Sequence, residues 1–96
     1  MSRNASSPAA GNKAAEELRD QQLSDVALIM KTRPGRRFMW RYLSKTYLFE
    51  TSFNNSGSIT AFNEGQRNVG LMMLADINEA APEEYLTMLK ESKEKQ

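Results

Sequence analysis

The spacing of apolar residues in the first third of the chain predicts an amphipathic helix. The helix is expected to begin at about Asn12, because asparagine caps helices and acidic residues follow in the first turn. Four apolar residues recur at steps of three and four and are expected on one buried face: Leu23, Val26, Ala27 and Met30. Proline disfavours helix in the preceding residue, so we expect a break at residues 32 to 35 and a new helix from Pro34.

Three further helices are predicted, over residues 34 to 49, over residues 60 to 79, and from Pro82 onward. Turn-forming residues predict a loop over residues 50 to 59, with Phe53 as its anchor and with Ser58 or Thr60 capping the third helix. The second helix is expected to bury apolar side chains on one side: Phe38, Met39, Tyr42, Leu43, Tyr47 and Phe49. The corresponding residues of the third and fourth helices are Phe62, Val69, Met73, Ile77, Tyr85, Met88 and Leu89.

No stretch alternates at period two, so the expected fold is all-α, a small bundle of three to four helices. We expect the two central helices to carry the core. Residues 1 to 11 have the composition of a flexible N-terminal arm, residues 12 to 90 form the helical domain, and residues 91 to 96 form a charged tail that frays.

Basic residues form a row along the second helix. Residues 31 to 45 contain no acid, whereas acids outnumber lysines from Asp76 to the end. The row can be neutralised by this acidic segment of the same chain, or by a neighbouring copy packed head to tail. Alternatively, it is a contact surface for phosphates or acidic protein, formed by Arg33, Arg36, Arg37, Trp40, Arg41 and Lys45.

A polar cluster interrupts the third helix at Glu64, Gly65 and Arg67. Glycine inside a helix costs about 1 kcal/mol relative to alanine, so we expect a large ring or a backbone segment to pack against Gly65. Glu64 can pair with Arg67 one turn later, and the cluster is then structural. The alternative is that Arg67 contacts another subunit.

Composition argues against most enzyme classes. The chain has no histidine and no cysteine, which removes the usual general base, the thiol nucleophile and the usual zinc ligands. No phosphate-binding loop or dinucleotide fingerprint is present, and no apolar run is long enough for a membrane span. We therefore expect a non-enzymatic protein that needs no cofactor or metal.

Three segments together resemble one family: RPGRRFMWRYL, FNEGQRNVGLMMLADI and PEEYLTML. They are similar to small podophage proteins of the family named from a Bordetella phage protein, the Bbp19-like phage domain. The resemblance covers roughly residues 22 to 90, with matching positions at Gly35, Arg36, Arg37, Phe62, Glu64, Gly65 and Arg67. Genes of this family lie among those for the virion head and portal. The resemblance therefore implies a virion-associated protein.

The leading hypothesis is a structural or virion-associated protein that acts through protein contacts. Its place is a minor head, portal or tail component, or an internal protein ejected with the DNA. The expected partners are other virion proteins, with a homo-oligomer as an option, and the expected location is the virion, with the host cytoplasm during assembly. The alternative is a small nucleic-acid-binding protein that uses the basic row of residues 31 to 45 to contact DNA.

Overall fold

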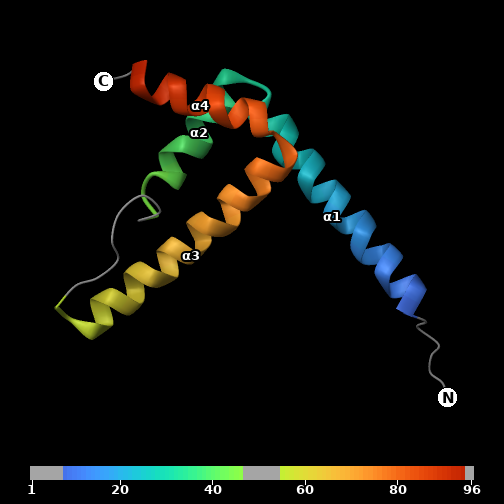
Figure 1. Ribbon diagram of the computed structural model, residues 1–96, viewed down its shortest axis with the longest axis horizontal. Helices are drawn as coiled ribbons and strands as arrows, with labels where there is room; N and C mark the ends of the chain where they lie inside the picture. The colour runs from blue at the N-terminus through green and yellow to red at the C-terminus, as the bar shows by residue number, and fades with distance from the viewer. Residues whose placement is uncertain (1–7, 47–54, 95–96) are drawn as a thin grey trace.

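The structure is a computed structural model that describes residues 8–46 and 55–94. In this part of the chain it contains four α-helices and no strand, which confirms the predicted all-α class (Figure 1). The helices are α1 (Pro8–Met30), α2 (Arg33–Leu43), α3 (Gly57–Ala80) and α4 (Pro82–Glu94).

Two helix starts differ from the expectation. Helix α1 begins at Pro8, so residues 8 to 11 of the predicted arm are helical, because proline is favoured in a first turn. Residues 1 to 7 of that arm lie outside the described residues. Helix α3 begins at Gly57, because the side chain of Ser56 accepts a hydrogen bond from the Ile59 amide and takes the capping role that we expected of Ser58 or Thr60.

Two helix ends also differ. Helix α2 ends at Leu43, where tight turns over Ser44 and Thr46 follow. The prediction of helix is therefore wrong for residues 44 to 46, whereas residues 47 to 49 of the predicted helix and the anchor Phe53 lie outside the described part. Helix α4 continues to Glu94, four residues into the predicted frayed tail, because its last acids pair with α2.

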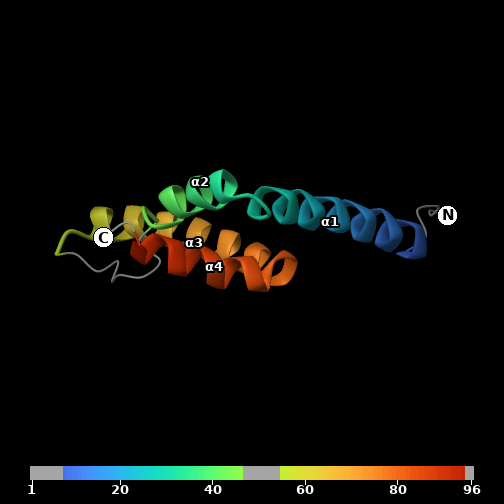
Figure 2. The same cartoon turned by 90° about the horizontal axis from the view of Figure 1, so that it is seen from above.

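The four helices form two thin layers. Helices α1 and α2 lie in one layer and α3 and α4 in the other, as the view from above shows (Figure 2). Helices α1 and α3 diverge from the corner where α1 meets α2 and α3 meets α4 (Figure 1). The radius of gyration is 17.7 Å, whereas a compact chain of this length has about 12 to 13 Å. The arrangement is therefore open and flat.

All four helices contribute to the core, rather than the two central ones alone. Its buried residues are Met30, Met39, Leu43, Ile77, Ala81 and Met88. Half of these are methionine, whose flexible side chain fills the irregular space where four helix segments meet. The core sits at the corner, so the segments far from the corner have little cover.

The buried faces of α2 and α3 were partly mispredicted. Met39 and Leu43 are buried, but Phe38 and Tyr42 beside them are half exposed. On α3 the buried positions are spaced by seven residues, at Asn63, Gly70 and Ile77, whereas Phe62 and Val69 are exposed. The buried side of α3 is therefore turned by one residue from the predicted stripe: Asn63 and Gly70 are covered at the same turns where Phe62 and Val69 face solvent.

Candidate interaction surface

Arg36 ties three helices together at the corner. Its Nε and Nη2 atoms donate to the two carboxylate oxygens of Glu91 on α4, both at 2.9 Å. Its Nη1 atom donates to the carbonyl oxygens of Met30, at 3.0 Å, and Lys31, at 3.2 Å. These carbonyls end α1 and have no partner within that helix. Arg36 is therefore a structural residue that joins α1, α2 and α4.

The neighbouring Gly35 allows this corner to close. A side-chain carbon at this position would overlap the backbone carbonyl of Ile29 at the end of α1. The Gly35 amide also donates to the hydroxyl of Thr32, the N-cap of α2. Glycine is thus required here for a close approach of two backbones.

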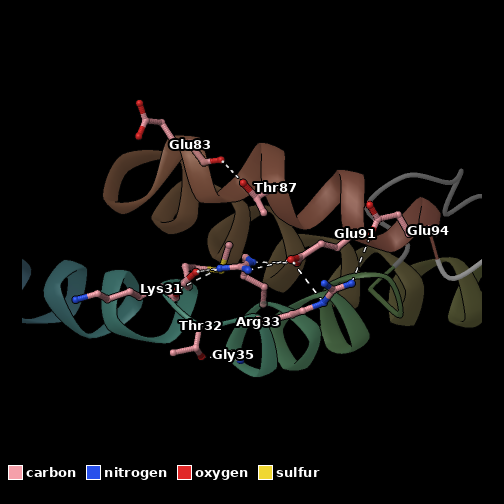
Figure 3. Close-up of polar contacts among 10 residues, drawn as sticks. Lys31, Thr32, Arg33, Gly35, Glu83, Thr87, Glu91 and Glu94 are labelled. Atoms are coloured by element: carbon pink, nitrogen blue, oxygen red, sulfur yellow. Dashed lines mark hydrogen bonds and ion pairs between the residues drawn. The ribbon is translucent and has the colours of Figure 1, made fainter.

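A second ion pair extends the contact between α2 and α4. The Nη2 atom of Arg33 lies 3.3 Å from Oε1 of Glu94, and its Nε atom lies 3.8 Å from Oε2 of Glu91. The three side chains face one another between the two helices (Figure 3). Two arginines of the basic row are therefore neutralised by the C-terminal acids of the same chain, which was one of the two arrangements expected from the charge pattern.

These contacts shift the pKa values of both partners in the buried pair. Hydrogen bonding to Glu91 raises the pKa of Arg36, and hydrogen bonding from Arg36 lowers the pKa of Glu91, with partial burial opposing each shift. The positive charges of Arg36, Arg33 and Arg37 lower the pKa of Glu91 further. The pair is therefore charged near neutral pH, and it stabilises the corner in that state.

The other basic residues of the row face solvent. Within the described residues, Arg37, Arg41 and Lys45 form no ion pair, and the Arg41 guanidinium lies 5.1 Å from the centre of the Tyr42 ring. Arg37, Arg41 and Trp40 border a shallow cavity of about 420 Å³ between α2 and α4, with Met88 and Glu91 on its far wall. We call this cavity the basic groove.

A second groove lies on the other side of α2. It has a volume of about 540 Å³ and almost entirely apolar walls, and we call it the α2–α3 groove. It is lined by Phe38, Tyr42, Lys45, Thr46, Gln66, Val69 and Met73. The rings of Phe38 and Tyr42 pack edge to face on one wall, with their centres 5.1 Å apart.

The predicted polar cluster of α3 does not form as a unit. No ion pair joins Glu64 to Arg67, both of which are described, and Glu64 makes other interactions. The expectation that a ring or backbone packs against Gly65 is wrong: a side-chain carbon there would meet open space. The buried glycine of this helix is Gly70. The cost of Gly65 to the helix is therefore not offset by packing within the described chain.

One clamp was not anticipated from the sequence. Arg19 on α1 reaches two acids of α3, Asp76 at 2.8 Å and Glu79 at 3.0 Å. Asp76 and Glu79 are three residues apart and thus share a helix face, but nothing in the local pattern links them to an arginine some sixty positions earlier. The clamp lies next to the exposed residues 11 to 18 of α1, a segment that extends away from the other helices (Figure 1).

The part of the chain that the structure describes contains neither a metal site nor a membrane-spanning helix. Among residues 8–46 and 55–94, no group of three or more acidic side chains is placed to hold a metal ion. None of the helices within these ranges combines the length and apolar character that crossing a membrane requires.

Comparisons with known proteins give one match. No curated protein and no solved structure matches the chain. The family model described as Bbp19-like phage protein matches residues 26–90, which is more than half of the chain. The match begins in the last turns of α1 and runs through α2, α3 and most of α4, so it includes every lining residue of the α2–α3 groove and all seven positions of the sequence resemblance. It ends one residue before Glu91, the partner of Arg36. The chain therefore belongs to the family of Bbp19-like phage proteins.

Proposed function

We propose that this protein is a non-enzymatic structural component of the phage particle that acts through protein contacts. The observation that carries the proposal is the large apolar surface of α2 and α3. Five side chains of that surface are about half exposed or more: Phe38, Tyr42, Phe62, Val69 and Met72. Three of them, Phe38, Tyr42 and Val69, line the α2–α3 groove together. Contiguous exposed apolar side chains of this kind are typical of proteins that assemble.

Charge and chemistry support the same proposal. The chain lacks histidine and cysteine, so the usual acid–base and nucleophilic groups are missing from its grooves. Arg36 and Glu91 bind each other at the corner and thus serve the fold. The place in the particle that we propose is a minor head, portal or tail position, or the interior, with the host cytoplasm as the site of assembly.

The test is quantitative mass spectrometry of phage particles purified through two density gradients. We expect a fixed copy number relative to the portal protein, unchanged between the first and second gradient. A host cytoplasmic protein followed in the same samples serves as the control, because a contaminant is depleted by the second gradient. Depletion of this protein in parallel with the host control would overturn the proposal.

Nucleic-acid binding is the second candidate, and the basic groove favours it. Arg37 and Arg41 lie beside Trp40, an arrangement suited to phosphate contact and base stacking. Against it, Arg33 and Arg36 are paired with acids, and Glu91 lines the same groove.

A DNA-binding titration at several salt concentrations distinguishes nucleic-acid binding from the structural role. Phosphate contacts predict a steep fall of affinity with log salt that is reduced in Arg37→Ala and Arg41→Ala.

A further inference from the structure

The N-terminal part of α1 is a helix without cover. Every side chain of residues 11 to 18 is exposed, and both ribbon views show this end of α1 extending away from the other helices (Figures 1 and 2). A helical segment of this length is marginal in water unless it packs against something. We call residues 8–18 the α1 arm.

One face of the α1 arm is built for close packing. Gly11, Ala14, Ala15 and Leu18 recur at helical spacing, so small side chains and one leucine share a face. Leu18 is 55% exposed. Lys13, Glu17 and Asp20 follow one another at helical spacing along the flank of this face, so the flank carries two acids and one base and is acidic in balance. Neither Glu17 nor Asp20 has an ion pair within the described residues.

The α2–α3 groove has the complementary properties. Its walls are the rings of Phe38 and Tyr42 and the side chains of Val69 and Met73, and large rings pack well against a helix face of small residues. Lys45 lines this groove, Arg41 lies over the ring of Tyr42, another lining residue, and neither base has an acidic partner in the described chain. An apolar helix face with acids on its flank therefore fits this groove in both shape and charge.

The arm and the groove of one chain point away from each other. The arm leaves the corner on one side and α3 leaves it on the other (Figure 1). Two grooves packed face to face would bring Arg41 and Lys45 of one copy close to the same residues of the other, which like-charge repulsion disfavours. A contact between the arm of one copy and the groove of the next does not require the two surfaces of one chain to meet. It also keeps the basic residues of the two grooves apart.

We infer that the α1 arm of one copy lies in the α2–α3 groove of a second copy, so that the chain assembles head to tail. This contact covers both exposed apolar surfaces and pairs Glu17 and Asp20 with Arg41 and Lys45. It is heterologous, and thus it closes into a ring or continues as a filament, depending on the rotation between copies. The inference rests on the structural role proposed above and names the partner of the apolar surface.

Sedimentation velocity of the full chain over a wide concentration range tests the inference. We expect species larger than the monomer as the concentration rises. Leu18→Lys in the arm and Val69→Lys in the groove should each weaken association about tenfold or more, because each places a charge in the apolar contact. Leu86→Lys is the matched control, since Leu86 on α4 is 65% exposed and belongs to neither surface. Circular dichroism checks that all three variants fold.

Mixing the two defective variants gives the sharper test. Leu18→Lys retains its groove and Val69→Lys retains its arm, so an equimolar mixture should recover a 1:1 dimer that does not grow further. A face-to-face contact between grooves predicts no recovery, and that result would overturn the inference.

A protein that stays monomeric at every concentration would also overturn it, as would cross-linking of the groove to a different virion protein in particles. Either result leaves the proposed structural role intact if the protein is found in particles at a fixed copy number. The two proposals therefore fail separately.

Discussion

At the scale of single residues, Arg36 and Arg37 are adjacent arginines with different roles. Arg36 donates hydrogen bonds to Glu91, Met30 and Lys31, and its side chain is only 13% exposed. We predict that Arg36→Ala lowers the free energy of unfolding by about 2 kcal/mol, because hydrogen bonds to a charged group are lost and Glu91 is left mostly covered without its partner. Urea unfolding followed by circular dichroism measures this change.

Arg37→Ala is the control for that prediction. Arg37 is exposed and forms no ion pair in the part of the chain that the structure describes. Its removal should change the free energy of unfolding by less than about 0.5 kcal/mol. Equal losses in the two variants would show that the corner does not depend on the geometry of Arg36.

Two glycines provide a second prediction, with opposite signs. Gly35→Ala should destabilise the protein by about 1 to 3 kcal/mol, because the added carbon overlaps the Ile29 carbonyl, a backbone group that cannot rotate away. Gly65→Ala should stabilise it by about 0.5 to 1 kcal/mol, because the added carbon meets open space inside a helix. Thermal melting of both variants gives the signs, and a loss of stability in Gly65→Ala would contradict the open environment of Gly65.

The sequence could predict some of these residue roles and not others. Charge asymmetry offered pairing between the basic row and the C-terminal acids as one alternative, and the structure forms it between α2 and α4. The sequence could not select Glu91 as the partner of Arg36, because 55 positions separate them and only the fold sets their distance. For the same reason, the sequence could not predict the ion pairs of Arg19 with Asp76 and Glu79. The prediction for Gly65 was wrong because a glycine that weakens a helix need not have a packing partner within the same chain.

At the scale of helices, the spacing of apolar residues predicted which segments are helical, but it predicted less well which side of each helix is buried. The spacing of Val26, Met30, Ile77 and Met88 identified faces that are indeed buried or partly buried. Phe62 and Val69 follow an equally good stripe, but they are exposed because the buried side of α3 lies at the neighbouring residues Asn63 and Gly70. A hydrophobic period records that a face must be covered, and it does not say whether the same chain covers it.

The contact between α2 and α4 predicts how stability depends on pH. Hydrogen bonding from Arg36 lowers the pKa of Glu91 in the folded state below its ordinary value of 4.5. The stabilisation is then fully present above that value and is lost as the pH falls through the lowered pKa. We predict that the wild type loses stability over this range, whereas Glu91→Gln is less stable at neutral pH and loses less on acidification. Urea unfolding between pH 7 and pH 3 measures both.

Glu83→Gln is the control for this pH dependence. Glu83 lies on the same helix, and its exposed carboxylate has no ion-pair partner among the residues that the structure describes. We expect its pH profile to follow that of the wild type. A profile of Glu91→Gln parallel to both would exclude Glu91 as the titrating group.

At the scale of the whole molecule, stability is concentrated at one end. The six buried apolar residues of the described chain all lie at the corner, and Arg36 and Glu91 close the same region. Local opening is easiest where few apolar contacts oppose it. The open shape therefore divides the molecule into a protected corner and a weakly held extension, the α1 arm.

Hydrogen exchange resolved by mass spectrometry makes this division testable. In dilute solution we predict the slowest amide exchange in the segments around Met39, Leu43, Ile77 and Met88, because opening there exposes the core. Residues 11 to 18 should exchange fastest among the helices, because every side chain in this segment is exposed. Head-to-tail assembly adds a second expectation: at high concentration the arm and the segment around Val69 gain protection together. The Leu18→Lys variant should lose that gain in both places while the corner stays protected. A slowly exchanging arm in dilute solution would contradict the division, because the arm would then be stable without a partner.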